Sequence, residues 1–460
     1  MKTFRSSKHS HVMGETQVDF QLSSGAAYVD LLNSYLSFNV SFEGAAAIEG
    51  VEMPAHAGFL QMISGYRVIH SSGVELDRMN TTAGEWMQLQ NYYNRSSATR
   101  RTTGTLYNMN DSINPQPINA YGCGIQEVNK ANLAQVAEAK LATSLPLPEE
   151  TDARERHHRV VIPLAHLAGI FDQDLLAPSF LTAGLRIELE FYSKEHFFIK
   201  PGTWAATDRV IISQPEINLE CFQLTDSIVR KLSQISASSG LEWYWDAVHN
   251  MTTTKGDTAI TVQVTRALSR ANCMIVKSRH DSAVGRFDQD SYASQPWVHS
   301  LGAKIGDQFD KGNSGNLVGF QVQLGAQFIP SQPIRHKEDF LHSALKTYSQ
   351  FRRNDEVGSV EMPAFTGIKM TQATDAVPGR YKPGLAIAAV PLESSSTLQQ
   401  SGSAISAQRT AVVNIEFQHT PNTLIDSGGS SIAGSLRRVD VFVPYSKLAT
   451  LFLDSVVVRS

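Results

Sequence analysis

The sequence is poor in cysteine and has no long hydrophobic run. Its 460 residues include three cysteines, which stand far apart at Cys123, Cys221 and Cys273 and form no C-x-x-C motif. This spacing excludes a zinc ribbon and a dense disulfide framework, and it favours a reducing compartment. No apolar stretch approaches the roughly 20 residues of a membrane-spanning helix, and the N-terminus lacks the apolar core of a secretory signal. We therefore expect a protein that neither spans a membrane nor is secreted.

The chain also has no large excess of charge of either sign. Its formal net charge is -4 and its isoelectric point is about 6.4, which excludes a bulk attraction to nucleic acid or to an anionic membrane. The best local basic segment is N-terminal, where Lys2, Arg5 and Lys8 face no acidic residue. Three charges support only a weak phosphate contact, so we expect residues 1–16 to form a mobile arm.

Familiar catalytic motifs are missing as well. The sequence has no G-x-S-x-G elbow, no phosphate loop of the G-x-x-x-x-G-K type and no G-x-G-x-x-G motif after a strand. His9 and His11 have the H-x-H spacing of metal ligands in cupin barrels, but no acidic ligand follows them in register. We therefore expect no catalytic residue, no metal and no cofactor, and a protein that is not an enzyme.

What the sequence has in abundance is strict alternation of apolar and polar residues. Such alternation predicts antiparallel strands with one buried face and one wet face. It recurs from one end of the chain to the other, in residues 34–42, 185–192, 258–264, 319–328, 414–417 and 437–443. Helical periodicity is sparse, with its clearest examples in residues 127–142 and 338–351. Many short strands with a few docked helices predict sandwich or jelly-roll domains.

Small polar residues mark the boundary between two halves of similar length. The segment 231–240, KLSQISASSG, follows one strand-rich region and precedes another. We predict a first domain over residues 17–230, a linker over 231–240 and a second domain over 241–460.

One segment of the first half interrupts the strand pattern. In VVIPLAHLAGIFDQDLLAPSFLTAGLRIELEF, residues 160–191, the last part alternates strictly, but the first part is spaced as a short helical turn would be. Prolines and a glycine separate this turn from the strands around it. We call this short helical segment the apolar turn; its apolar residues are Leu164, Leu167, Ile170 and Phe171.

Aromatic residues suggest two contact surfaces. Tyr92, Tyr93 and Arg95 combine residue types that interfaces favour. Trp243 and Trp245 lack interleaved Lys or Arg, so stacking on bases is disfavoured relative to a core or subunit contact. We take these five residues as interface candidates.

Several segments in both halves together resemble one family. They include AAYVDLLNSYLSFNVSF at 26–42, IPLAHLAGIF at 162–171, VQLGAQFIPSQPI at 322–334 and RRVDVFVPYSKLATLFLDSVVV at 437–458. In this order and spacing the chain is similar to the double jelly-roll major capsid proteins of tailless double-stranded DNA viruses, especially the Polinton, adintovirus and virophage-like branch. The resemblance implies an all-β fold of two tandem eight-stranded jelly rolls with a few short inserted helices.

The resemblance also implies a function and a place for the apolar turn. Members form homotrimeric capsomers of near-hexagonal outline that tile an icosahedral shell, next to neighbouring capsomers, penton proteins and minor capsid proteins. We expect the protein in the virion, assembled in the host cytoplasm or nucleus, with a weak genome or inner-membrane contact through the N-terminal arm. The apolar turn would plug an open barrel end or dock on the neighbouring barrel. Two alternatives stay open: a two-barrel, bicupin-like metal enzyme, and a carbohydrate-binding β-sandwich of a viral fibre.

Overall fold

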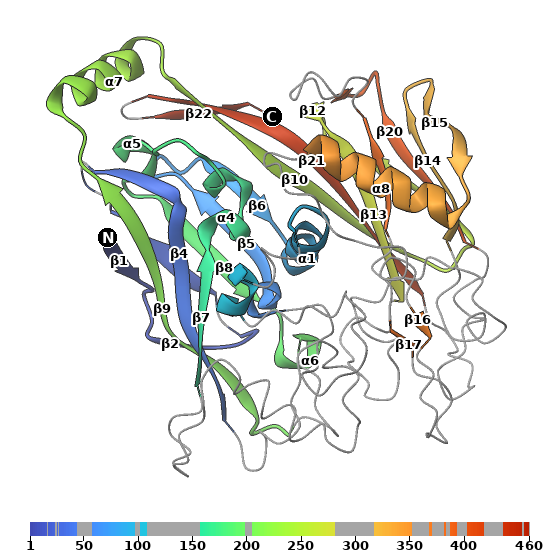
Figure 1. The fold of residues 1–460 in the computed structure, drawn as a ribbon, viewed down its shortest axis with the longest axis horizontal. Helices are drawn as coiled ribbons and strands as arrows, with labels where there is room; N and C mark the ends of the chain where they lie inside the picture. Colours follow the sequence, from blue (N-terminus) through green and yellow to red (C-terminus); the bar gives the residue numbers. More distant parts are fainter. Residues whose placement is uncertain are drawn as a thin grey trace.

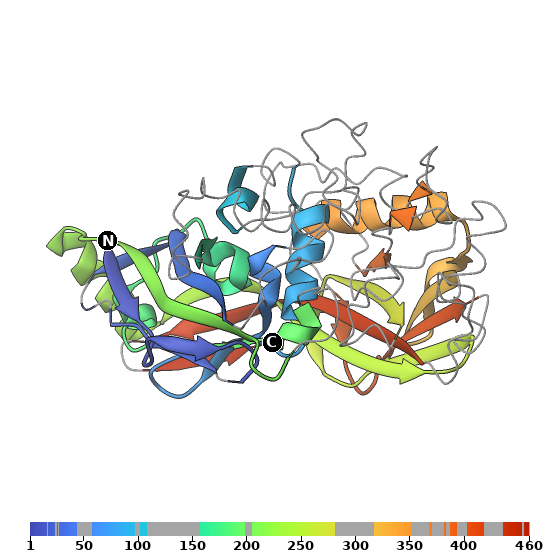
Figure 2. The same ribbon diagram turned by 90° about the horizontal axis from the view of Figure 1, so that it is seen from below.

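The structure is a computed structural model of the chain. It describes residues 1–15, 17–23, 25, 27–43, 58–96, 102–107, 157–197, 205–280, 317–351, 368–369, 381–382, 387–392, 403–417, 436–452 and 455–459. The helix predicted over 127–142 lies outside these ranges. Two strand-rich halves lie side by side along the longest axis of the molecule (Figures 1 and 2).

The first half is a jelly roll made of eight strands. They are β2 (Ser10–Val12), β3 (Val18–Gln21), β4 (Tyr28–Glu43), β5 (Ile63–Ile69), β6 (Glu75–Met79), β7 (His157–Pro163), β8 (Arg186–Phe191) and β9 (Arg209–Phe222). One sheet has the order β2-β9-β4-β7 and the other has the order β3-β8-β5-β6, with antiparallel neighbours throughout. Counted along the chain, these orders are 1-8-3-6 and 2-7-4-5, which define a jelly roll.

The second half repeats this arrangement with a different sequence. Its eight strands are β10 (Leu241–Lys255), β11 (Ala259–Val264), β13 (Cys273–His280), β14 (Leu317–Leu324), β15 (Gln327–Ile334), β18 (Ala388–Pro391), β20 (Ala411–Phe417) and β21 (Arg437–Leu451). The two sheets are β10-β21-β13-β18 and β11-β20-β14-β15, again in the orders 1-8-3-6 and 2-7-4-5. The predicted fold of two tandem eight-stranded jelly rolls is therefore confirmed.

Short strands extend these sheets. In the second half, β12 (Leu268–Ala271), β19 (Ser403–Ile405) and β22 (Val456–Arg459) join the sheet that contains β21, and β16 (Ile368–Lys369) pairs with β17 (Tyr381–Lys382). The core of each half lies between its two sheets. In the first half Phe38 of β4 meets Phe191 of β8 edge to face, with ring centroids 5.8 Å apart.

Two helices occupy equivalent positions in the two halves. Helix α1 (Ala83–Tyr93) follows β6, the fifth strand of its jelly roll, and helix α8 (Lys337–Phe351) follows β15, the fifth strand of the other. The helix predicted over 338–351 is thereby confirmed. Figures 1 and 2 show α1 between the two halves, where it is placed to contact both. A shorter 3-10 turn, η1 (Phe59–Met62), precedes β5, and η2 (Thr103–Tyr107) follows α1.

The prediction of a mobile N-terminal arm was wrong. Strand β1 (Lys2–Arg5) and strand β2 both pair with β9, and β2 is the first strand of the jelly roll, so the first domain begins before residue 17. Arg5 Nε lies 3.0 Å from Glu216 Oε1, which places an acid opposite one of the basic residues of the segment. Strands of three or four residues are too short to show a reliable alternation, which is why the sequence did not reveal them.

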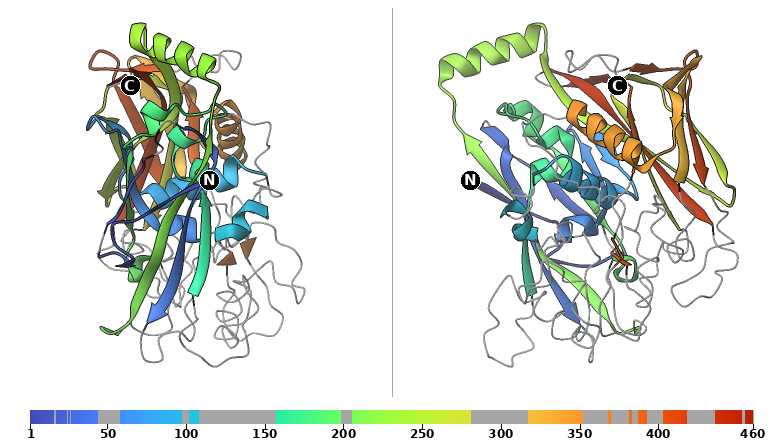
Figure 3. Two further views of the ribbon diagram at one scale, coloured as in Figure 1. Left: turned by 90° about the vertical axis from the view of Figure 1, so that its left-hand side faces the viewer. Right: turned by 45° about the vertical axis from the view of Figure 1, so that its right-hand side comes forward.

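The residues predicted as a linker, 231–240, are largely helical. Helix α7 (Asp226–Ser238) joins β9 to β10 and projects from one corner of the molecule (Figures 1 and 3). The helix ends at Ser238, and Gly240 follows with a φ of +77°, which suits glycine because other residues are strained there. The backbone N–H of Gly240 donates to Ile235 O at 3.0 Å, which closes the last turn.

Candidate functional site

The apolar turn lies at the boundary between the two jelly rolls. It forms helix α4 (Leu164–Leu167) followed by the 3-10 turn η5 (Gly169–Phe171), as its spacing predicted. Its four side chains, Leu164, Leu167, Ile170 and Phe171, are at most 2% exposed. Strand β8 beyond it also follows the predicted pattern, with Ile187, Leu189 and Phe191 buried.

The apolar turn contacts both halves. Helix α4 packs against β4 and β7 of its own jelly roll, whereas η5 packs against β10 of the second one. The approach to β10 is close: a Cβ atom added to Gly169 would lie 2.0 Å from the backbone oxygen of Asp246. Only a residue without a side chain fits at this position. The turn thus docks the first jelly roll on the second.

The structure corrects the interface candidates. Four of the five candidates are at most 5% exposed within the single chain: Tyr92 and Tyr93 on α1, and Trp243 and Trp245 on β10. They therefore offer no surface to another chain. Arg95 is half-buried and hydrogen-bonds to Asn91. Tyr and Trp are favoured equally by interiors and by interfaces, so composition could not separate the two roles.

These aromatic residues nevertheless help to form an interface inside the chain. Tyr93 on α1 stacks on Tyr348 of α8, with ring centroids 4.8 Å apart and an interplanar angle of 17°. The ring of Trp86, also on α1, lies beside that of Phe442 on β21, with ring centroids 5.6 Å apart. Helix α1 therefore joins the two jelly rolls through direct aromatic contacts, including one with its counterpart α8.

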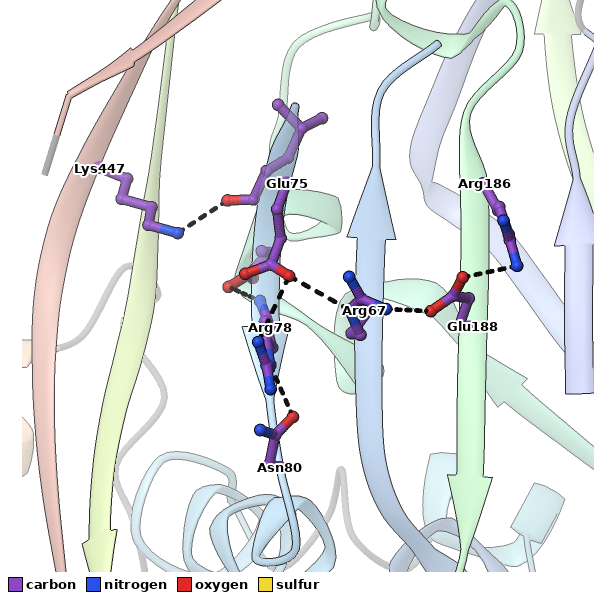
Figure 4. Close-up of polar contacts among 9 residues, drawn as sticks. Arg67, Glu75, Arg78, Asn80, Arg186, Glu188 and Lys447 are labelled. Atoms are coloured by element: carbon purple, nitrogen blue, oxygen red, sulfur yellow. Dashed lines mark hydrogen bonds and ion pairs between the residues drawn. The ribbon is translucent and has the colours of Figure 1, made fainter. Parts of the chain in front are cut away.

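A buried pair of opposite charges crosses the same boundary. Asp77 of β6 is 0% exposed, and Lys447 of β21 is 7% exposed. Lys447 Nζ donates to the backbone oxygen of Leu76 at 2.8 Å, and Figure 4 shows this side chain reaching from one half toward the other. The backbone N–H of Arg78 donates to Asp77 Oδ1 at 2.9 Å. The backbone N–H of Ile170 in the apolar turn also donates a hydrogen bond to this carboxyl. The pair thus links β6, β21 and η5.

Burial dominates the titration of both members of the pair. It raises the pKa of Asp77 from 3.8 to about 6, although Lys447 acts in the opposite direction. Burial likewise lowers the pKa of Lys447 from 10.5, against the influence of Asp77. Burial therefore disfavours the charged form of each side chain, and the opposite charge of its partner offsets part of that desolvation cost.

Asp77 should make the stability of the protein depend on pH. Between its ordinary pKa of 3.8 and its folded pKa of about 6, the folded chain retains a proton that the unfolded chain releases. Its stabilising contribution is complete below about pH 4 and is lost as pH rises through about 6. We expect Asp77→Asn to flatten the dependence of thermal stability on pH between 4 and 7, as measured by circular dichroism. Parallel curves for the variant and the parent protein would contradict this assignment.

A row of charges crosses the sheet β3-β8-β5-β6 of the first half, and Figure 4 shows its members on β8, β5 and β6. We call it the ionic row, and its members in order across the strands are Asp19, Arg186, Glu188, Arg67, Glu75 and Arg78. Glu188, whose side chain is 4% exposed, lies 2.8 Å from both Arg67 Nη1 and Arg186 Nη2. Exposed ion pairs add little stability one by one, but a continuous row favours one register of the four strands.

The described residues give no centre for metal chemistry. Within the ranges that the structure describes, no three His, Cys, Asp or Glu side chains lie together as a metal site would require. His11 is buried near Ser6 Oγ, 3.1 Å away, whereas His9 is exposed, so the H-x-H pair does not converge. In the same ranges, no helix is long and apolar enough to cross a membrane.

Comparison with known proteins adds to the topology. No family model matches the sequence, and no curated protein matches it. Solved structures do match. A chain of the PBCV-1 virus capsid superimposes with a TM-score of 0.55 at 10% identity, covering 100% of this chain and 96% of that chain. The mavirus major capsid protein gives a TM-score of 0.54 at 8% identity, covering 100% of this chain and 89% of that chain.

A third match has the same character. The Faustovirus major capsid protein gives a TM-score of 0.55 at 8% identity, covering 98% of this chain and 90% of that chain. Identities this low establish the fold alone. The chain is thus a double jelly-roll protein. Its fold is the one found in the major capsid proteins of these DNA viruses, which confirms the predicted resemblance at the level of structure.

Proposed function

We propose that the protein is a major capsid protein that forms homotrimeric capsomers of near-hexagonal outline. The observation that carries this proposal is the pair of jelly rolls with the same strand order, fixed side by side through a buried junction. Three copies of such a chain place six similar domains around one axis, and a six-sided tile covers a surface without gaps. The full-length likeness to three viral capsid chains supports the same role.

The junction supports a structural task rather than catalysis. A tile needs a fixed angle between its two domains, since each error in that angle is repeated at every copy in the shell. The apolar turn, helix α1 and the pair Asp77–Lys447 all span the boundary between the halves, so they hold this angle together. In this proposal the protein acts in the virion, with neighbouring capsomers, penton proteins and minor capsid proteins as partners, and it assembles in the host cytoplasm or nucleus.

The remaining expectations from the sequence have less support. Contact with genome or inner membrane through the N-terminal segment stays a prediction from the sequence, with β1 and β2 paired with β9 in place of the expected mobile arm. The carbohydrate-binding alternative required exposed aromatic residues, and Trp243 and Trp245 are buried. The metal-enzyme alternative has no supporting cluster of ligands among the described residues.

Analytical ultracentrifugation and negative-stain electron microscopy of the purified protein test the proposal. We expect a species with three times the 50.5 kDa mass of one chain, and particles of hexagonal outline. A stable monomer at micromolar concentration that forms no hexagonal particle would contradict the proposed function.

A further inference from the structure

Helix α7 presents an apolar stripe that its own chain leaves partly uncovered. Ile228, Leu232 and Ile235 have the spacing of one helix face, and Ile228 and Ile235 are 45% and 44% exposed. The face next to this stripe packs on the body of the molecule, where Ser236 Oγ donates to Leu451 O at 3.1 Å. A helix of 13 residues gains most of its stability from burying an apolar face, so this stripe calls for a partner.

A surface suited to receive it lies at the other end of the molecule. Strand β15 is the last strand in the sheet order β11-β20-β14-β15, so one of its edges is unpaired among the described strands. Phe328 on this strand is 49% exposed. Figure 1 shows α7 and β15 at opposite ends of the longest axis and at a similar height along the strands.

The charges beside the two surfaces are opposite in sign. Lys231 is exposed on α7 next to the apolar stripe, three residues after Ile228 and four before Ile235. Glu338 and Asp339 are exposed in the first turn of α8, a few residues after the end of β15. Opposite charges around an apolar centre favour one partner and one orientation.

We propose that α7 of one copy docks on the β15 edge and the start of α8 of a second copy of this chain. This inference rests on the proposed trimer and names the surfaces that close it. The contact is heterologous: each copy gives α7 to one neighbour and β15 to the other, which closes a ring when the rotation fits. Contact between two α7 helices would instead be isologous, and it would stop at a dimer.

The first test removes the apolar stripe. We expect Ile228→Ser/Ile235→Ser to sediment as one chain at micromolar concentration, where the parent protein sediments as three, with an unchanged circular dichroism spectrum. The matched control is Gln234→Ser/Ala237→Ser, which alters two exposed positions on the other side of the same helix and should leave the trimer intact. Phe328→Ser should also abolish the trimer, because it alters the receiving surface.

Mixing the two defective proteins tests the pairing itself. The Ile228→Ser/Ile235→Ser protein keeps its β15 surface, and the Phe328→Ser protein keeps its α7. Their mixture has one intact contact per pair, so we expect a species of two chains that neither protein forms alone. A ring of three cannot close from this mixture because at most one of its three contacts would have both surfaces intact.

The alternative outcomes are distinct. If the parent protein is a trimer and both variants stay trimeric, the assignment of α7 and β15 is wrong while the proposed function stands. If the parent protein is a monomer, the proposed function fails first. If the α7 variant stays trimeric but no longer binds vesicles of phosphatidylcholine and phosphatidylserine that the parent protein binds, α7 is a membrane contact and the inference is overturned.

Discussion

Phe171→Ala should lower the free energy of unfolding by about 3 to 5 kcal/mol. Phe171 is 0% exposed and lies in η5, the part of the apolar turn that packs against β10. Truncation removes its apolar contacts and leaves a cavity at the boundary between the two jelly rolls, where two rigid sheets cannot easily collapse to fill it. Chemical denaturation followed by tryptophan fluorescence measures the loss, since Trp245 lies buried on β10.

Leu175→Ala is the matched control for this prediction. Leu175 lies four residues further along the same loop but is 67% exposed, so its truncation should change stability by no more than about 0.5 kcal/mol. Equal effects of the two truncations would show that the apolar turn does not join the halves.

Lys447→Met should also lower the free energy of unfolding, by about 3 to 5 kcal/mol near pH 8. Methionine fills much of the same volume, but it leaves the Asp77 carboxylate buried without its opposite charge. The pKa of Asp77 should then rise above its present value of about 6, because Lys447 no longer lowers it. The loss should therefore be smaller at pH 5, where Asp77 is protonated, than at pH 8.

The double variant Asp77→Asn/Lys447→Met separates the pair from its parts. It removes both charges, and the asparagine oxygen can still accept from the backbone N–H of Arg78. We expect it to regain a substantial part of the stability that Lys447→Met loses, and to show a weaker dependence on pH. A double variant less stable than Lys447→Met at pH 8 would mean that the charge of Asp77 has a partner other than Lys447.

Periodicity along the sequence predicted the fold well where strands were long and had one wet face. Strand β8 is an example, with Ile187 and Leu189 buried as expected. It failed for β1 and β2, which have only four and three residues and are defined by pairing with β9, about 200 positions away in the chain. It also failed for α7, whose many serines resemble a linker although Ile228, Leu232 and Ile235 keep helical spacing.

The junction was predictable only in part. The spacing of the apolar turn identified Leu164, Leu167, Ile170 and Phe171 as a packed group, and the structure buries all four. Asp77 and Lys447 gave no signal, because a charged residue in a strand normally indicates the wet face. Each of them lies on the boundary between two domains, and such a position depends on how the domains dock rather than on the local pattern. The aromatic candidates were recognised as contact residues, but their partners lie within the same chain.

The position of the final strand in each half determines when that half can fold during synthesis. Strand β9 lies between β2 and β4, and β21 lies between β10 and β13, so neither jelly roll can be completed until its last strand has left the ribosome. At roughly 5 to 20 residues per second, the 222 residues up to the end of β9 take about 10 to 45 seconds. During that interval one edge of β4 is unpaired, and the apolar turn stays uncovered longer still, until β10 is made and packs against η5. The time for which a nascent chain is open to wrong pairing is therefore set by translation, and a cell that makes many copies at once must hold many unfinished sheets apart.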